Sequence, residues 1–219
     1  VDENYLLVGN TTTLTIVPDT VDVNGIVVTE VKLYDGNNTA EVVNMGVPTP
    51  VYGNDDLSLI TTATYDNADT GSNKTITAHV ELTGADVDNY VLAITSVVVT
   101  TSGAIVSPID IDESQADEGI AVDADGYCSG DNSSVQFFLT SGNPNQYKLV
   151  YDSAAHAEGF VDVDWSNIAT AGNIELVIPT NAKYGTYSAT LTLRNGAYPQ
   201  FESAAIPVSF VVNVSRNYT

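Results

Sequence analysis

The chain has 219 residues, of which 43% are hydrophobic, so it is long enough for two ordinary β domains and too apolar for wholesale disorder. Six lysines and arginines stand against 28 aspartates and glutamates, a net charge of −22. So few cations cannot neutralise phosphates, which excludes nucleic acid and an anionic membrane surface as partners. Its apolar runs are too short to cross a bilayer, so we expect no direct membrane insertion by this segment.

The first strong local signal lies at Asp35 and Gly36. An alternating run ends in Tyr34 just before them, and a further strand is predicted at Glu41–Val43. Asp-Gly between alternating apolar residues is typical of a hairpin turn, because glycine adopts the positive φ that a primed turn needs. We therefore predict a hairpin here, with structural roles for Tyr34, Asp35 and Gly36.

Alternation with a period of two recurs along the chain, and no helical period persists. The apolar members of three such runs are Ile76, Ala78, Val80 and Leu82; Tyr187, Ala189, Leu191 and Leu193; and Val208, Phe210, Val212 and Val214. The opposite faces of the first two runs are rich in threonine, as in antiparallel sheets with one solvated face. Many short strands separated by polar turns predict an all-β protein made of two antiparallel β-sandwich, immunoglobulin-like domains in series.

An acid-rich stretch at residues 107–119 divides the chain. Pro108 ends the preceding strand, and the residues after it carry many carboxylates and little to bury. We predict that this stretch is a linker or a first edge strand. The two domains would then comprise residues 1–107 and residues 108–219.

Several sequence pieces follow one another in order between residues 29 and 105. They are Tyr34–Gly36, Gly53–Leu57, Ala63–Asp66, Asn67–Gly71, Lys74–Thr77 and Leu82–Tyr90. In this order they resemble the YDG domain, a short β module repeated along large bacterial surface proteins related to filamentous haemagglutinin. Residues 1–28 lie outside the resemblance, and we expect them either to complete the sheet or to end a preceding module.

In the second half, Gly185 leads into an alternating strand that contains Tyr187. This pattern resembles the immunoglobulin-like modules of Gram-negative surface proteins, in which Tyr187 would be the corner tyrosine, with its hydroxyl reaching back to the backbone. Ala189 stands where antibody domains have a cysteine. We predict that Trp165 is a core residue, and an exposed role in stacking on sugars is the alternative.

The sequence offers little for catalysis. His79 is predicted on the polar face of its strand, and His156 in a loop or single helical turn. The familiar hydrolase and zinc motifs are absent from the sequence. The single cysteine, Cys128, forms no internal disulfide and is predicted to be a small buried side chain. We therefore predict that the protein is not an enzyme.

Calcium is the one cofactor that the sequence suggests. Asp110 and Asp112 form one pair of hard oxygen ligands, and Asp123 and Asp125 form another. After Asp125 the later ligands of an EF-type loop and its closing glutamate are missing. A solvated acidic loop is the preferred interpretation, so we predict neither a metal site nor any other cofactor.

We interpret the chain as a non-catalytic stalk or adhesin-type segment of an exported protein on the surface of a Gram-negative bacterium. Its partner would be a host or cell-surface protein or a glycan, and the sequence leaves the ligand and the oligomeric state open. The alternative is a carbohydrate-binding module of a surface glycan-utilisation system. That function needs an exposed aromatic platform, for which the available residues are Tyr5, Tyr52, Tyr65, Tyr198 and Trp165.

Overall fold

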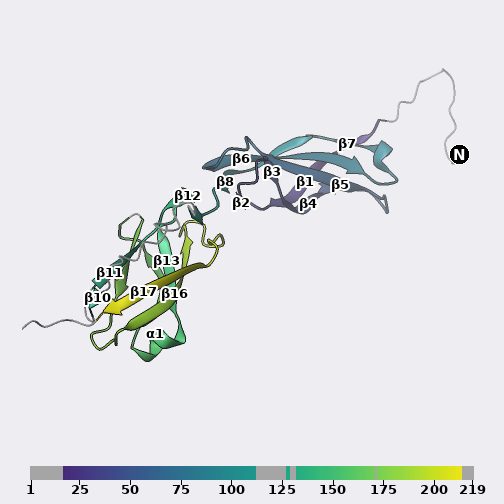
Figure 1. The fold of residues 1–219 in the computed structure, drawn as a ribbon. Helices are drawn as coiled ribbons and strands as arrows, with labels where there is room; N and C mark the ends of the chain where they lie inside the picture. The colour runs from purple at the N-terminus through teal and green to yellow at the C-terminus, as the bar shows by residue number, and fades with distance from the viewer. Residues whose placement is uncertain (1–16, 112–126, 129–131, 171, 214–219) are drawn as a thin grey trace, which may run out of the picture. The chain divides into compact units, whose positions relative to one another are not determined.

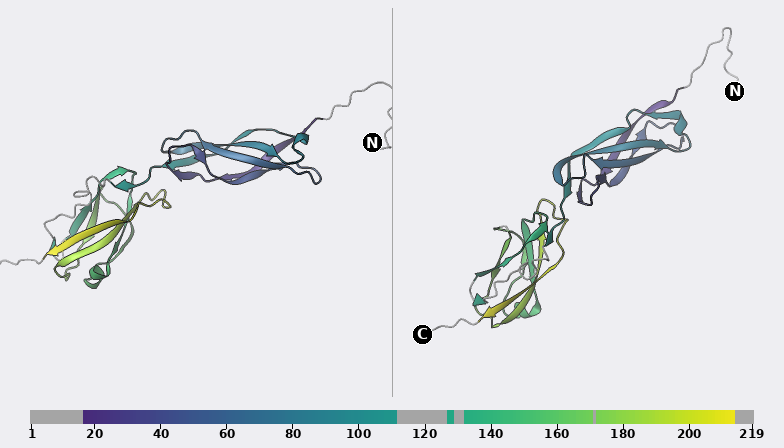
Figure 2. Two further views of the ribbon diagram at one scale, coloured as in Figure 1. Left: turned by 45° about the vertical axis from the view of Figure 1, so that its right-hand side comes forward. Right: turned by 45° about the horizontal axis from the view of Figure 1, so that its top comes forward.

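The structure, a computed structural model, describes residues 17–111, 127–128, 132–170 and 172–213. These residues form two compact β units (Figure 1, Figure 2). The first unit comprises the described residues up to Lys32 together with Gly36–Ala104. The second comprises Leu33–Asp35 and the described residues from Ile105 onward. The prediction of an all-β protein with two β bodies is confirmed.

The first unit consists of two sheets. Its elements are β1 (Asp19–Val28), β2 (Val31–Leu33), β3 (Thr39–Ala40), β4 (Val42–Thr49), β5 (Ser58–Tyr65), β6 (Gly71–Thr83), the 3-10 turn η1 (Val87–Asn89), β7 (Tyr90–Leu92) and β8 (Ser96–Val106). One sheet has the strand order β4-β1-β7 and the other β2-β8-β6-β5-β3. β1 runs antiparallel to β4 and parallel to β7, so this sheet is mixed rather than purely antiparallel as predicted.

The core of the first unit lies between its two sheets. Ile76 and Val80 of β6 are buried and His79 is exposed, as the alternation predicts. The Thr61 hydroxyl of β5 donates to the Met45 carbonyl of β4 at 2.7 Å, which connects the sheets. Since Thr61 is buried, this bond avoids the cost of an unsatisfied hydroxyl.

The predicted hairpin at Asp35 and Gly36 is wrong. β2 and β3 lie at opposite edges of the five-stranded sheet, where they pair with β8 and β5. Gly36 does have a positive φ of 82°, and Oδ1 of Asn37 accepts the Thr39 N–H at 2.9 Å within the connection. The chain bends at Gly36 and Asn37 without forming a hairpin turn, because long-range partners decide which strands pair.

The second unit is built on a five-stranded sheet. Its elements are β9 (Asp110–Ile111), β10 (Tyr127–Cys128), β11 (Asn132–Gln136), β12 (Leu139–Ser141), β13 (Gln146–Tyr151), α1 (Ser153–Ala157), β14 (Val163–Asn167), β15 (Asn173–Val177), β16 (Gly185–Arg194) and β17 (Ile206–Asn213). The sheet order is β10-β17-β16-β13-β14, and β11-β15 and β12-β9 form two further pairs. β10 and β17 are parallel, and the other pairings are antiparallel.

Two strands supply much of the core of the second unit. The buried side chains are Tyr187, Ala189, Leu191 and Leu193 of β16, and Ile206, Val208, Phe210 and Val212 of β17. Both alternations are those predicted, and Val214 lies outside the described residues. The rings of Tyr151, Phe160, Tyr187 and Phe210 pack in tilted and edge-on arrangements that suit aromatic pairs.

The residues after Pro108 belong to the second unit. β9 pairs with β12, and Ile109 and Ile111 pack against the core. The Ser141 hydroxyl donates to the Pro108 carbonyl at 2.8 Å. This part of the predicted linker is therefore the edge strand that the sequence left as the other option. Residues 112–119 lie outside the described part of the chain.

Candidate functional site

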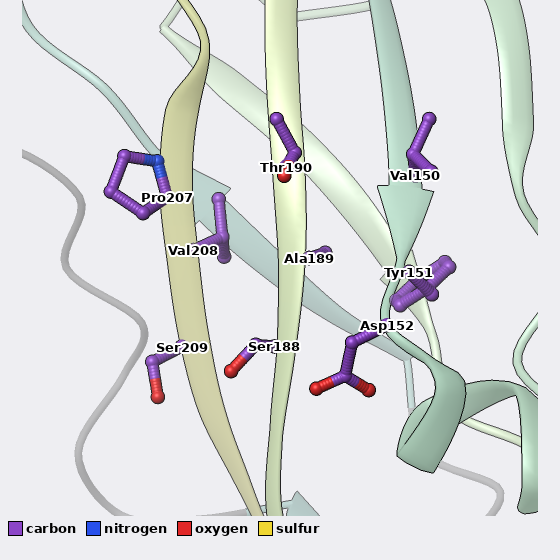
Figure 3. A pocket seen from close by; sticks show the side chains of 9 residues that line it. All are labelled: Val150, Tyr151, Asp152, Ser188, Ala189, Thr190, Pro207, Val208 and Ser209. Carbon is purple, nitrogen blue, oxygen red and sulfur yellow. The ribbon is translucent and has the colours of Figure 1, made fainter.

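A shallow depression of about 530 Å³ lies on the outer face of the five-stranded sheet of the second unit (Figure 3). Its lining residues come from β13, β16, β17 and the start of α1: Val150, Tyr151, Asp152, Ser188, Ala189, Thr190, Pro207, Val208 and Ser209. Tyr151, Ala189 and Val208 are buried. The other six lining residues supply aliphatic groups, hydroxyls and the carboxylate of Asp152.

The polar side chains that line the depression include one carboxylate and several hydroxyls. Its carboxylate, Asp152, already caps α1, because Oδ1 accepts the Ala155 N–H at 2.7 Å. The nine lining residues include no histidine, lysine or cysteine that would activate the hydroxyls of Ser188 and Ser209. What the surface offers is aliphatic contact and hydrogen bonding to a chain or a sugar.

Asp162 anchors α1 beside this depression. Its Oδ1 accepts the Tyr151 N–H at 2.8 Å and lies 2.8 Å from Nε2 of His156. Both contacts lower the pKa of the Asp162 carboxyl, and the hydrogen bond from the Tyr151 N–H has the larger effect. The stabilisation is present above the ordinary carboxyl pKa and is lost as the pH falls through the lowered value. The side chains of His156 and Asp162 are each 44% exposed, so solvent screens the interaction between them. His156 therefore has a local structural role.

Of the four residues considered as calcium ligands, the structure describes one. Asp110 lies in β9. Asp112, Asp123 and Asp125 lie outside the described residues. Within the described ranges, no three side chains of the ligand types His, Cys, Asp and Glu are placed to hold a metal ion.

The aromatic residues considered for a sugar platform differ in their burial. Tyr65 is buried in the first unit, whereas Tyr52 is 57% exposed. Tyr198 is partly buried in the second unit, and Tyr5 lies outside the described residues. In the described ranges the packed ring pairs belong to the core of the second unit. These residues show no stacked, exposed platform.

Trp165 lies outside the buried core, so the prediction for it is wrong. In the pairing of β14 with β13, Ser166 lies opposite Tyr147 and Val163 lies opposite Leu149. Two residues of β13 therefore span three of β14, which is a register shift. The irregularity breaks the alternation that would place Val163 and Trp165 on one face. Val163 packs against the core, whereas the Trp165 ring stacks with the Arg194 guanidinium at 3.9 Å from the ring centroid.

Tyr187 makes the corner hydrogen bond that the sequence predicted. Its hydroxyl donates to the Lys183 carbonyl at 2.9 Å. The side chain is 6% exposed, and burial raises the pKa of the hydroxyl. A Cβ at Gly185 would lie 3.3 Å from the hydroxyl oxygen, so the glycine leaves room for the ring.

Replacing Tyr187 with phenylalanine is expected to lower the free energy of unfolding of the second unit by about 1 kcal/mol, the net value of a typical hydrogen bond. Trp165 is the single tryptophan and lies in this unit, so its fluorescence during chemical denaturation reports the change. Tyr184→Phe is the matched control, because Tyr184 is 69% exposed. Equal midpoints for the wild type and Tyr187→Phe would contradict a stabilising role for the bond.

Two loops of the first unit, one containing Asp56 and the other Asp86, are hydrogen-bonded to each other. The sequence analysis named these residues only as part of the YDG-like pieces. The Asp56 N–H donates to Oδ2 of Asp86 at 2.7 Å, and the Asp86 N–H donates to the Asp56 carbonyl at 3.2 Å. The Tyr90 hydroxyl donates to Oδ2 of Asp55 at 2.7 Å and accepts the Tyr52 N–H at 3.0 Å. Polar groups of Gly53–Leu57 and Leu82–Tyr90 thus connect these two segments by hydrogen bonds.

The fold and its side chains define a modular protein of two β units. Residues 17–98 match the family model of the YDG domain, so this part of the first unit is similar to that family. No curated protein sequence matches the chain. The helices within the described ranges are all too short or too polar to cross a membrane.

Two solved structures are similar to the chain at low identity. One is the crystal structure of chicken CNTN1 FN1-FN3 domains, with 9% identity, 90% of this chain and 68% of that chain covered, and a TM-score of 0.33. The other is the central fibronectin-III array of RIM-binding protein, with 10% identity, 92% and 71% coverage, and a TM-score of 0.29.

The YDG match begins earlier than the resemblance seen in the sequence. The resemblance did not extend to residues 1–28, whereas the match includes residues 17–28. β1 lies in this segment and forms the middle of the β4-β1-β7 sheet. Of the two options for this segment, completing the sheet is the one observed for its described part.

Proposed function

We propose that this chain is a non-catalytic segment of an exported bacterial surface protein, in which the two β units act as stalk or adhesin-type modules. The observation that carries the proposal is a YDG domain followed by a second β unit with its own core. The net charge of −22 supports it, because a strongly charged surface keeps exposed modules soluble and apart.

The absence of a catalytic role is part of the proposal. Nδ1 of His79 lies 2.8 Å from the Ser96 hydroxyl, but both side chains are exposed on the surface of the first unit. His156 is held by Asp162 beside α1. Both histidines thus have local partners on open surface, where a substrate would not be sequestered from water.

Antibodies raised against the chain are expected to label intact cells of the bacterium that produces the full-length protein. Protease added outside the cells should remove that labelling. Labelling that requires permeabilised cells would contradict a surface location.

A competition assay, in which the soluble chain is added to cells that attach to a host surface, distinguishes an adhesive role from a stalk role. For an adhesin segment, the soluble chain should reduce attachment of the producing cells to their host surface; for a stalk it should not. Binding to a glycan array that is lost in Tyr52→Ala but kept in Tyr187→Phe would favour the carbohydrate-binding alternative.

A further inference from the structure

Lys74, at the start of β6, is a buried lysine. It is 5% exposed, and among the described residues it is the one charged side chain in the interior. Its Cε lies 3.9 Å from where a Cβ would stand at Gly71, the first residue of β6. An ammonium group removed from water is costly unless it is closely paired and hydrogen-bonded.

The amine of Lys74 meets an amide more closely than a carboxylate. Nζ lies 2.5 Å from Oδ1 of Asn67, which is shorter than the usual range of about 2.7–3.2 Å for N–H···O bonds. Oδ1 of Asp66 is 3.6 Å away, beyond ordinary hydrogen-bond distance. Oδ1 of Asn67 also accepts the Asp69 N–H at 3.0 Å. The nearest group to the buried amine is therefore a carboxamide already polarised by a backbone donor.

Hydrogen bonds at the ends of β5 and β6 fix the positions of Asp66 and Asn67. The Asp66 N–H donates to the Thr75 carbonyl at 2.9 Å, which fixes the end of β5 beside the start of β6. The Asn67 N–H donates to Oδ1 of Asp66 at 2.9 Å. Asn73 adopts a positive φ of 56° immediately before Lys74. Fixed reactants of this kind need little further ordering to react.

We propose that Lys74 and Asn67 become joined by an intramolecular isopeptide bond. Asp66 first takes a proton from the Lys74 ammonium, and the neutral Nζ attacks Cγ of Asn67. The Asp69 N–H stabilises the negative charge that develops on Oδ1. The new Nζ–Cγ bond forms as the Cγ–Nδ2 bond breaks.

The protons balance without an oxidant or reductant. The Lys74 nitrogen loses two protons as it changes from an ammonium to an amide. Asp66 passes one of them to Nδ2 of Asn67, which leaves as ammonia, and the other is released to solvent. The product replaces a buried charge by a neutral amide and links the loop to the start of β6. This inference does not depend on the proposed surface role.

Mass spectrometry of the intact, folded chain tests the bond directly. We expect a mass lower than that of the sequence by one ammonia. Cyclisation at Asn24-Gly25 or Asn195-Gly196 would cause the same loss, so a digest must locate it. A protease that cleaves beside Asp69 cuts between the two residues, and the resulting peptides should remain joined through Asn67 and Lys74.

Variants distinguish the bond from simple burial of a lysine. Lys74→Arg and Asn67→Ala are expected to show the full sequence mass, and Asp66→Asn should form the bond far more slowly. Lys32→Arg is the matched control: Nζ of Lys32 lies 2.9 Å from Oδ1 of Asn37, but this lysine is not buried, so the ammonia loss should persist. Asn67→Asp should lose water in place of ammonia. Circular dichroism checks that each variant is folded.

Two results would overturn the proposal. One is a folded wild-type chain in which the Asn67 and Lys74 peptides separate after digestion. The other is a cross-link located at Lys32 and Asn37. Full bond formation in Asp66→Asn would refute the proton transfer assigned to Asp66.

Discussion

Replacing Phe210 with alanine is expected to destabilise the second unit by about 3–5 kcal/mol, the range for truncating a buried phenylalanine. Phe210 is 2% exposed and sits among three aromatic rings. Its ring centroid lies 5.3 Å from that of Phe160, 6.0 Å from Tyr187 and 6.2 Å from Tyr151. Because these rings belong to separate segments held by their own contacts, they cannot collapse fully into the cavity.

Such a loss is large compared with the roughly 5–15 kcal/mol that stabilises a whole domain. Trp165 fluorescence should report it as a marked fall in the denaturation midpoint. Phe138→Ala is the matched control, since Phe138 is 39% exposed and should lose much less. Tyrosine and circular dichroism signals should show the first unit unfolding at its original midpoint. If the first unit unfolds together with the second, the two units do not fold independently of each other.

Replacing Gly84 with alanine is expected to destabilise the first unit by roughly 2–6 kcal/mol, which combines backbone strain with overpacking. Gly84 has a φ of 128°, a conformation that residues with a Cβ rarely adopt. A Cβ there would lie 2.1 Å from the Asp56 carbonyl oxygen. The two loops would have to separate, and the hydrogen bonds between Asp56 and Asp86 would be lost.

Gly36→Ala separates these two causes. Gly36 also has a positive φ, 82°, but a Cβ there would meet no atom within 4 Å. Strain alone should then cost about 1–2 kcal/mol. Thermal unfolding followed by circular dichroism compares the two variants. A cost for Gly84→Ala no greater than that for Gly36→Ala would mean that the contact between the loops yields easily.

The sequence alone determined which side chains face the core in the regular strands. Successive residues of a strand point to opposite faces, so the alternation at Ile76–Val80, Tyr187–Leu193 and Val208–Val212 carried the burial pattern directly. It also predicted the corner bond of Tyr187, because the hydroxyl reaches a carbonyl only four residues away.

Only the tertiary structure decided which distant segments meet. It placed β2 and β3 at opposite edges of a sheet, although Asp35 and Gly36 had predicted a hairpin. A register shift in β14 turned Trp165 away from the core. The tertiary structure also brought Asn67, in the loop after β5, next to Lys74 of β6, which the order of the motifs did not predict. Turn signals and alternation act over a few residues, whereas strand pairing and irregularities depend on partners far along the chain, which no local pattern encodes.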